Sequence, residues 1–320
     1  MSLSLTTWNV NGIRASLRKG LKEKISQNNW DIICLQELKC QDEDMSKIFS
    51  DDDSSLANIF LSDNKVFNED KNQSESLIRN YKAYWHTAKN RKGYSGTAIL
   101  IKKTLIENST IQILDFITSL NLHEFDIEGR ITALKLKIDD KIIYLLNGYY
   151  PQGGREGRVD YKIRFYREIY NLCAKWIQEG FDVLLCGDLN STLKDTDLAR
   201  PTQNRKTTGC LPQERVAFNW LLDDKFFESE QLKIKDKDFE YLEINPLESL
   251  NFYDLYRHYY PSLADQYTYW DQITKARDRN VGWRIDYWIA SKNLLSKITD
   301  IEIQSEILGS DHCPVTLYYL

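Results

Sequence analysis

Short apolar runs, some alternating with polar residues and some continuous, recur along most of the chain. Runs of about four to eight such residues are typical of half-buried and fully buried strands. They predict strands at Leu3–Val10, Asp31–Gln36, Tyr81–His86, Gly96–Lys102, Ile131–Ile138, Lys141–Tyr149, Phe181–Gly187, Arg284–Ser291, Ile298–Gln304 and Pro314–Tyr319.

Apolar residues at helical spacing occupy several of the intervening segments. In Asp160–Glu179 they form one stripe that ends at Gly180, and shorter patterns predict helices over Ala15–Gln27 and Pro212–Asp223. Strands and helices that alternate, with antiparallel hairpins among them, favour a layered α/β sandwich. The pattern predicts a single domain over residues 1–320 and leaves open whether it contains one sheet or two.

Two polar segments interrupt this pattern and are predicted to be surface insertions. Residues 46–80 are rich in Asp, Ser and Asn, and residues 228–248 are charged without a clear period. We expect surface loops or short surface helices in both, because a buried loop would leave backbone polar groups without hydrogen bonds.

The net charge of −5 lacks the basic excess that most nucleic-acid-binding proteins show. The distribution changes this picture, because residues 41–80 hold ten acidic and four basic side chains, a net charge of −6, which leaves +1 for the rest. A metal site also needs carboxylates, which do not repel DNA once the cation is bound. The composition therefore admits a nuclease, although it predicts weak long-range attraction to DNA.

The six cysteines form no Cys-x-x-Cys pair and are predicted to be structural thiols. The sequence has no run of about 18 apolar residues, so no membrane span is predicted. No secretory signal is expected at the N-terminus. We expect an intracellular, reducing location, either the cytoplasm and nucleoid or, in a eukaryote, the nucleus.

Carboxylate, amide, hydroxyl and imidazole side chains stand where several predicted strands end or begin. Because the ends of neighbouring strands meet at one edge of a sheet, such side chains converge on one site. Each alone is common in turns and on surfaces, and only their joint presence predicts an active site. The residues are Asn9, Asn11, Glu37, Tyr149, Asp188, Asn190, Asp286, Asp311 and His312.

Six short motifs contain these residues and follow one another along the chain. They are Trp8-Asn9-Val10-Asn11-Gly12, Leu35-Gln36-Glu37-Leu38-Lys39, Asn147-Gly148-Tyr149, Gly187-Asp188-Leu189-Asn190, Gly282-Trp283-Arg284-Ile285-Asp286-Tyr287 and Ser310-Asp311-His312. In identity and order they resemble the exonuclease III/AP endonuclease family over essentially the whole length, the two insertions excepted. Pro212-Gln213-Glu214-Arg215 and Leu308–Pro314 look especially like the eukaryotic-type AP endonucleases.

The resemblance implies a DNase I-like fold, a four-layer α/β sandwich in which two packed mixed β-sheets are flanked by helices. It also implies Mg²⁺ as the cofactor, with Mn²⁺ as an alternative. Glu37 and Asp311 match metal-binding carboxylates, and Asn11 stands where relatives carry Asp or Asn. Hard oxygen ligands of this kind suit Mg²⁺. Asn9 is expected to orient a phosphate oxygen or Asp188.

The same resemblance implies the catalytic roles. Asp188 is expected to align or deprotonate the attacking water. His312 and Asp286 match a His-Asp pair, in which the carboxylate selects the imidazole tautomer and stabilises its charged form. Tyr149 and Asn190 are expected to donate hydrogen bonds to phosphate oxygens.

A further group of residues matches positions at which the family reads damaged DNA. Tyr269, Trp270, Trp283 and Ile285 match the lining of a pocket for an extruded abasic sugar, and extrusion costs least where no base stacks. Basic side chains are candidate contacts to backbone phosphates. The loop residues expected to enter the DNA helix are Arg155 and Ile273, and the basic residues are Lys89, Arg91, Lys92, Lys275, Arg277 and Arg279.

These expectations describe a monomeric DNA-repair nuclease that cuts the phosphodiester 5′ to abasic sites in duplex DNA, with 3′→5′ exonuclease and 3′-phosphodiesterase activity on 3′-blocked ends. The alternative is another metal-dependent phosphoesterase of the superfamily, such as a DNase I-like nuclease or an inositol-phosphate phosphatase. Gly282–Asp286 and Pro151–Arg155 favour the DNA-repair branch. A non-catalytic DNA-binding or scaffold protein is disfavoured, because the set of catalytic residues is complete apart from Asn11, which carries an amide.

Overall fold

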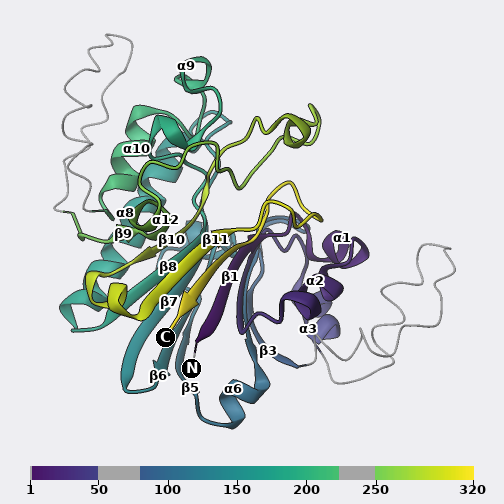
Figure 1. Cartoon of the computed structure of the whole chain (residues 1–320), viewed down its shortest axis with the longest axis vertical. Coiled ribbons are helices and arrows are strands. Elements are labelled where there is room, and N and C mark those ends of the chain that lie inside the picture. The colour runs from purple at the N-terminus through teal and green to yellow at the C-terminus, as the bar shows by residue number, and fades with distance from the viewer. Residues whose placement is uncertain (1, 50–79, 223–248) are drawn as a thin grey trace, which may run out of the picture.

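The computed structural model describes residues 2–49, 80–222 and 249–320, which contain two mixed sheets packed face to face (Figure 1). One sheet has the order β11 (Ile298–Ile303), β12 (Val315–Tyr319), β1 (Leu3–Asn9), β2 (Ile32–Gln36), β4 (Thr97–Lys102) and β3 (Tyr81–His86). The other has the order β5 (Ile111–Ile117), β6 (Ile131–Ile138), β7 (Lys141–Tyr149), β8 (Asp182–Asp188), β10 (Asp286–Ala290) and β9 (Tyr253–Asp254).

Each sheet has a parallel pair near its centre. β1 is parallel to β2, and β7 is parallel to β8, whereas their outer neighbours β12, β4, β6 and β10 run antiparallel to them. A parallel pair requires a crossover connection, and the helices between β1 and β2 and between β7 and β8 provide it. The alternation of strand and helix patterns in the sequence has this origin.

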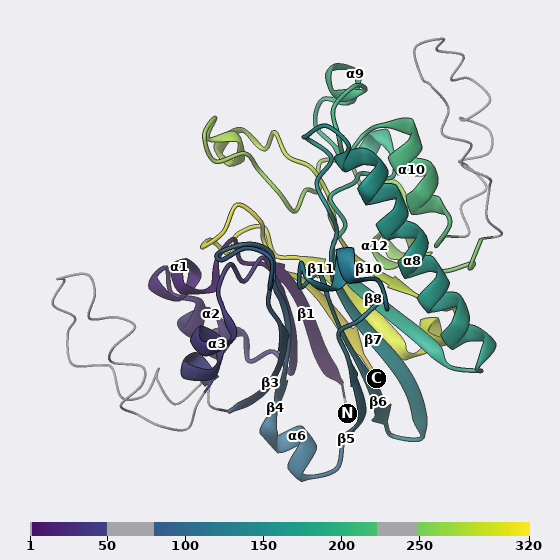
Figure 2. The ribbon, with the colours of Figure 1, turned by 180° about the vertical axis from the view of Figure 1, so that it is seen from behind.

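Helices cover the outer face of each sheet, which completes four layers and confirms the predicted fold class (Figure 2). Leu17, Ile25 and Met45 pack one group of helices against the first sheet, and Ile169 and Phe218 belong to the cluster that packs the other group against the second. The first group is α1 (Ile13–Arg18), α2 (Leu21–Asn28) and α3 (Asp42–Phe49), and the second is α8 (Arg158–Gln178) and α10 (Pro212–Asn219). Shorter helices in the connections are α6 (Lys103–Glu107), α7 (His123–Asp126), α9 (Pro201–Asn204) and α12 (Leu255–Tyr259), with 3₁₀ turns η1 (Asp195–Asp197), η2 (Ala276–Arg279) and η3 (Lys292–Lys297).

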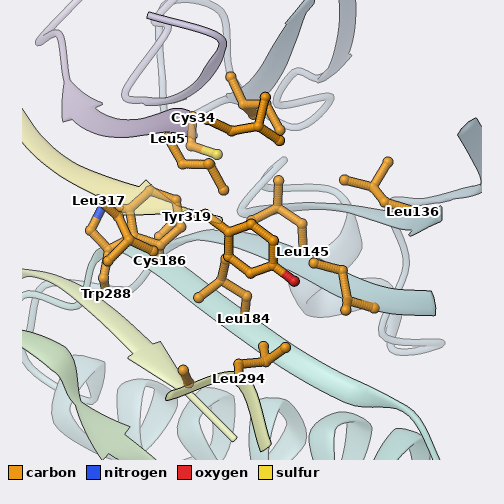
Figure 3. Packing of buried hydrophobic residues seen from close by; sticks show 14 of the residues in the cluster. Leu5, Cys34, Leu136, Leu145, Leu184, Cys186, Trp288, Leu294, Leu317 and Tyr319 are labelled. Atoms are coloured by element: carbon orange, nitrogen blue, oxygen red, sulfur yellow. The ribbon is translucent and has the colours of Figure 1, made fainter. Parts of the chain in front are cut away.

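The core between the sheets is apolar and continuous (Figure 3). Leu5 and Cys34 of the first sheet face Leu145, Leu184 and Cys186 of the second, and all are fully buried or nearly so. Close packing of this kind fixes the separation of the two sheets and therefore the positions of their strand ends.

Several elements differ from the sequence-based prediction. The helix predicted over Ala15–Gln27 is two helices, because the backbone turns at Gly20, whose φ of +86° is open to glycine. Both α3 and β5 were absent from the prediction, since α3 is highly charged and β5 is an edge strand with mostly exposed side chains. The strand predicted from Arg284 begins only at Asp286.

The predicted insertions fall mainly outside the described residues. Ser46–Phe49 form the end of α3, and most of the segment at 46–80 lies beyond the part of the chain that the structure describes, as does all of 228–248. Among the described helices, none is both long and apolar enough to cross a membrane.

Candidate active site

The strand ends place the candidate residues at one edge of the two sheets. β1 ends at Asn9, and β7 and β8 end at the neighbouring residues Tyr149 and Asp188, which are partners in register. β10 runs in the opposite direction, so it begins at this edge with Asp286 directly across from Asp188. β12 is likewise antiparallel to β1, which places His312 on the segment that enters the same edge.

A buried amide pair joins the two sheets at this edge. Gln36 at the end of β2 donates through Nε2 to Asn147 Oδ1 of β7 at 2.7 Å. Asn147 Nδ2 in turn donates to the backbone oxygens of Leu35 and Ala98 at 3.0 and 2.9 Å. Because both amides are fully buried and hydrogen-bonded across the sheets, they fix how the two strand edges face each other.

His312 and Asp286 form the expected pair. The Nδ1 atom of His312 lies 2.8 Å from Asp286 Oδ2, which also accepts a hydrogen bond of 2.6 Å from the Thr268 hydroxyl. This contact directs Nε2 toward Asp188, whose Oδ2 atom is 3.9 Å away. The other Asp286 oxygen, Oδ1, is buried and has no hydrogen-bond partner among the described residues. The pair therefore presents one imidazole nitrogen to the space beside Asp188.

Burial and the neighbouring opposite charge act in opposite directions on the pKa of His312 and on that of Asp188. Burial favours the neutral form of His312, but the Asp286 carboxylate outweighs it and raises the His312 pKa to about 10. Burial also raises the pKa of Asp188 to about 7, against the opposing effect of His312. The imidazole is therefore charged at neutral pH, and Asp188 has a pKa close to the range in which a general base works best.

Asp188 is held on both sides by amides. Asn9 Nδ2 donates to Asp188 Oδ2 at 2.8 Å, and the backbone N–H of Asn190 donates to Oδ1 at 2.9 Å. The side-chain amide of Asn190 donates to the Tyr150 backbone oxygen at 2.9 Å and to Asp188 Oδ2 at 3.3 Å. In this structure Asn190 thus holds Asp188, and both hydrogens of its amide are engaged within the protein.

Glu37 and Asp311 are connected through two other side chains. Lys39 Nζ lies 2.6 Å from Glu37 Oε2 and donates to the Asn11 side-chain oxygen at 2.5 Å. The Asn11 amide nitrogen then donates to Asp311 Oδ1 at 2.9 Å. The hydroxyl of Tyr149 donates to the other Glu37 oxygen. The ammonium group of Lys39 therefore bridges two oxygens expected to bind metal.

This donor set fits a hard divalent cation. Two carboxylates and an amide oxygen supply oxygen ligands, and the bridging ammonium of Lys39 shows that their arrangement accommodates positive charge. A second group, Asp188, Asp286 and His312, brings its ligand atoms within 4.8 Å of one another. The candidate metal ligands and the candidate catalytic residues thus form adjacent groups linked by Asn9, whose side-chain oxygen accepts from the Asn11 backbone at 3.0 Å.

A family model described as "Endonuclease/Exonuclease/phosphatase family" matches residues 6–312. The chain belongs to this family. A Bacillus subtilis protein named "Exodeoxyribonuclease" is 32% identical over 317 residues, 98% of each chain. "DNA repair nuclease APEX1" of Danio rerio is 29% identical over 99% of this chain and 82% of its own length. The catalytic domain of Xenopus laevis APE2 has a similar structure, with a TM-score of 0.71 and 25% identity over 98% of this chain and 91% of its own.

These relatives confirm the resemblance to the exonuclease III/AP endonuclease family. The chain is accordingly an enzyme of the nuclease type. The alternative of a non-catalytic DNA-binding or scaffold protein is not supported.

Tyr269, one of the residues expected to line a pocket for an extruded sugar, lies beside His312. The Tyr269 ring is 4.9 Å from the His312 ring, and backbone bridges join Tyr269 to both Trp283 and His312. Tyr269 and Trp283 are partly exposed. They are therefore accessible to a ligand, whereas Trp270 and Ile285 are buried within the protein.

Eight residues are expected to contact DNA beyond this pocket, and three of the first four considered are exposed. Arg155, Ile273 and Lys275 are exposed, and Ile273 keeps 93% of its surface. Arg277, the fourth, is engaged within the protein. Its guanidinium donates to the backbone oxygens of Ser305, Ile307 and Ser310 at 2.6, 3.0 and 3.3 Å, and it lies 4.5 Å from the Trp270 ring. Arg277 is thus a brace between two loops.

Of the other four basic residues predicted to contact phosphates, three have partners within the protein and the fourth is exposed. Lys89 forms an ion pair with Asp42, and the Arg91 guanidinium lies 5.6 Å from the Tyr94 ring. Lys92 is exposed, and Arg279 donates to the Thr274 backbone oxygen at 3.0 Å.

Sequence reasoning missed three residues that shape the site. Lys39 stands two residues after Glu37 inside a motif that was noticed, so its charge was an available signal. Arg130 is buried, donates to the Tyr149 backbone oxygen at 3.0 Å and lies 5.1 Å from its ring. Thr268, which orients Asp286, belongs to no motif, and only the fold reveals it.

Proposed function

We propose that this chain is a Mg²⁺-dependent nuclease that hydrolyses the phosphodiester bond 5′ to an abasic site in duplex DNA. The observation that carries the proposal is the buried Asp188 carboxylate, clamped by Asn9 and Asn190 and facing the His312 Nε2 atom at 3.9 Å. The names of the Bacillus subtilis and Danio rerio relatives support a nuclease acting on DNA. The same residues suit 3′→5′ exonuclease and 3′-phosphodiesterase reactions, which break the same type of bond.

In the proposed reaction a water oxygen adds to phosphorus and the bond to the 3′-oxygen breaks. Asp188 aligns the water and accepts its proton, while the leaving oxygen gains a proton from solvent. His312, oriented by Asp286, places a charged Nε2–H group against the phosphoryl oxygens and offsets their growing negative charge. Tyr149 is a further donor to the phosphate once its hydroxyl leaves Glu37.

We propose that Glu37, Asp311 and Asn11 hold the Mg²⁺ ion, with Mn²⁺ as an alternative. When bound, the cation supplies positive charge that stabilises the phosphate in the transition state. Because the Lys39 ammonium bridges Glu37 and Asn11, this side chain has to move away for the ion to enter. We propose that the enzyme acts as a monomer.

Exposed loops support an extended DNA duplex as the substrate. Ile273 keeps 93% of its surface in water, so it is accessible to a duplex. Arg155 is exposed on the loop between β7 and α8. Together with the partly exposed rings of Tyr269 and Trp283, they suit a lesion held in the extruded state. A DNA substrate also implies action in the cytoplasm and nucleoid or in a nucleus.

The direct test is cleavage of a 5′-labelled duplex that bears one tetrahydrofuran abasic analogue, with Mg²⁺ and with EDTA. We expect one Mg²⁺-dependent product that ends just 5′ of the lesion, and an intact control duplex that stays uncut. Asp188→Asn is the matched inactive variant, with kcat lowered by about 10²–10⁴-fold and binding to abasic DNA in EDTA retained. Absence of cleavage with every divalent metal would contradict the proposal, and a ladder from the 3′ end would make exonuclease action the main activity.

The alternative within the superfamily is a phosphatase of inositol phosphates. It shares the Glu37, Asp188 and Asp311–His312 elements, so the chemistry alone does not separate the two. Turnover of an inositol phosphate in the absence of turnover of abasic DNA would reverse our choice.

A further inference from the structure

A buried carboxylate outside the reaction site has four donors. Both oxygens of Glu214, which belongs to α10, are fully buried. Oε1 accepts from Lys162 Nζ at 2.9 Å and from the Thr208 hydroxyl at 2.6 Å, and Oε2 accepts from the backbone of Gly209 at 2.5 Å and of Leu211 at 3.1 Å. A carboxylate satisfied this completely is held in one position and holds its partners in theirs.

One of these partners leads to the catalytic turn. Lys162, on α8, is fully buried and donates a second hydrogen bond of 2.7 Å to the backbone oxygen of Asn190. Asn190 holds Asp188 through its backbone N–H and its side chain. The ammonium group of Lys162 therefore fixes the turn that clamps the proposed general base.

The other partner leads to the loop that carries Arg155. The Thr208 hydroxyl accepts a hydrogen bond of 3.1 Å from the backbone N–H of Gly153, two residues before Arg155. A Cβ atom on Gly153 would lie 2.3 Å from that hydroxyl oxygen, so the close approach requires glycine. Thr208 thus joins the loop to Glu214 directly.

We propose that Thr208 is a positioning residue that, through Glu214 and Lys162, couples the Pro151–Arg155 loop to the turn at Asp188. When the loop engages DNA, its position is transmitted to Asn190 along the chain of hydrogen bonds, so a displaced loop disturbs the turn that clamps the catalytic carboxylate. The inference rests on the proposed function and adds a residue that touches neither substrate nor the reacting atoms.

Thr208 is the residue of this hydrogen-bond network whose side-chain hydroxyl can be removed with the least damage to the fold. Lys162→Met would leave the buried Glu214 charge without its counter-ion, and loss of folding is expected. Thr208→Val removes the hydroxyl at nearly constant shape on a half-buried residue and leaves the Glu214–Lys162 pair in place. Thr208→Ser keeps the hydroxyl and is the matched control.

The experiment is a double-mutant cycle with Arg155→Ala, read on the 5′-labelled tetrahydrofuran duplex. Single-turnover rates are measured with Mg²⁺, dissociation constants are measured in EDTA, and thermal melting checks the fold. We expect Thr208→Val to lower the single-turnover rate about threefold to tenfold, to change the dissociation constant less, and to reduce the effect of Arg155→Ala on the rate. Thr208→Ser is expected to behave like the wild type.

Equal rates for Thr208→Val and Thr208→Ser would overturn the proposal, as would an unchanged effect of Arg155→Ala in the Thr208→Val background. Failure of the proposed function appears elsewhere, as a wild-type protein that cuts no abasic duplex, and the inference then falls with it.

Discussion

At the scale of residues, the site depends on side chains held in unusual backbone positions. Asn11, Glu37 and Asn190 have φ values of +48°, +53° and +52°, in the left-handed region that residues other than glycine rarely adopt. Such conformations persist only where neighbouring contacts enforce them, and they are common at functional sites. Here each one turns the chain directly after a strand and so directs a polar side chain into the shared edge.

Lys39 provides a test at this scale that does not depend on turnover. We expect Lys39→Met to bind Mn²⁺ more tightly in the absence of DNA, because no ammonium then competes for Glu37 and Asn11. Since the pair is partly exposed, its removal is expected to lower the dissociation constant about twofold to fivefold. Calorimetric titration or electron paramagnetic resonance of Mn²⁺ gives the measurement. Lys39→Arg keeps the charge and is the control, and weaker binding by Lys39→Met would show that the lysine supports the metal site.

At the scale of elements, two loops form the exposed side of the site and brace each other. Arg277 in η2 bonds three backbone oxygens of the segment that leads into Asp311 and His312. The backbone N–H of Trp270 also donates to the backbone oxygen of Asp311 at 3.0 Å. The position of Asp311 therefore depends on the segment that carries Ile273 and Lys275, although the two segments are distant in the sequence.

Substitutions of Lys275 and Arg277 are expected to have different effects. Lys275→Glu removes an exposed charge, so it should weaken duplex binding and lower the slope of log Kd against log salt by about 0.9 for a lost phosphate contact. Arg277→Gln should leave that slope unchanged and lower the free energy of unfolding by about 1–3 kcal/mol, because backbone oxygens lose their donor. Fluorescence anisotropy over a range of salt in EDTA, together with urea unfolding, separates the two. An equally reduced slope for Arg277→Gln would restore it as a phosphate contact.

At the scale of the whole molecule, a buried group of four charges joins segments from distant parts of the sequence. Asp197 Oδ1 accepts from Arg257 at 2.6 Å and from Arg284 at 3.0 Å, and Arg284 makes a two-pronged contact with Asp254 at 3.1 and 2.6 Å. The group is neutral as a whole, and each ion has a partner of opposite sign. It anchors the residues just before Asp286, where β10 begins.

This group predicts a pH dependence of stability. Burial alone raises the pKa of Asp197, but Arg284 and Arg257 outweigh it and hold the pKa below the usual 3.8. The lowered pKa contributes stability that is complete above pH 3.8 and is lost as the pH falls through the value in the folded protein. Asp197→Asn should lower the free energy of unfolding by about 3–5 kcal/mol at pH 7, because two buried arginines lose a counter-ion. The difference from the wild type should shrink below pH 3.8 in urea titrations, and a difference independent of pH would contradict this account.

The sequence by itself predicted most of the strands and, through the family resemblance of its motifs, the fold class and the residues that the structure gathers at the candidate site. Apolar periodicity is a local signal, so the strands ending at Asn9, Tyr149 and Asp188 were predicted close to their observed bounds. The polar residues at those strand ends lie in motifs whose order along the chain was sufficient to indicate the family. Because strand ends of one sheet share an edge, their convergence also followed from the pattern.

Only the tertiary structure decided which partners these residues have. Three contacts show this: Lys39 bridges Glu37 and Asn11, Arg277 bonds three backbone oxygens, and Thr268 contacts Asp286. Each joins segments that are distant in the chain, and hydrophobic periodicity does not indicate such pairs. The break at Gly20 was missed because the apolar stripe continues across it, while the backbone conformation depends on a single residue. Periodicity reports which side of an element is buried, whereas a hydrogen bond between distant residues depends on how complete layers pack together.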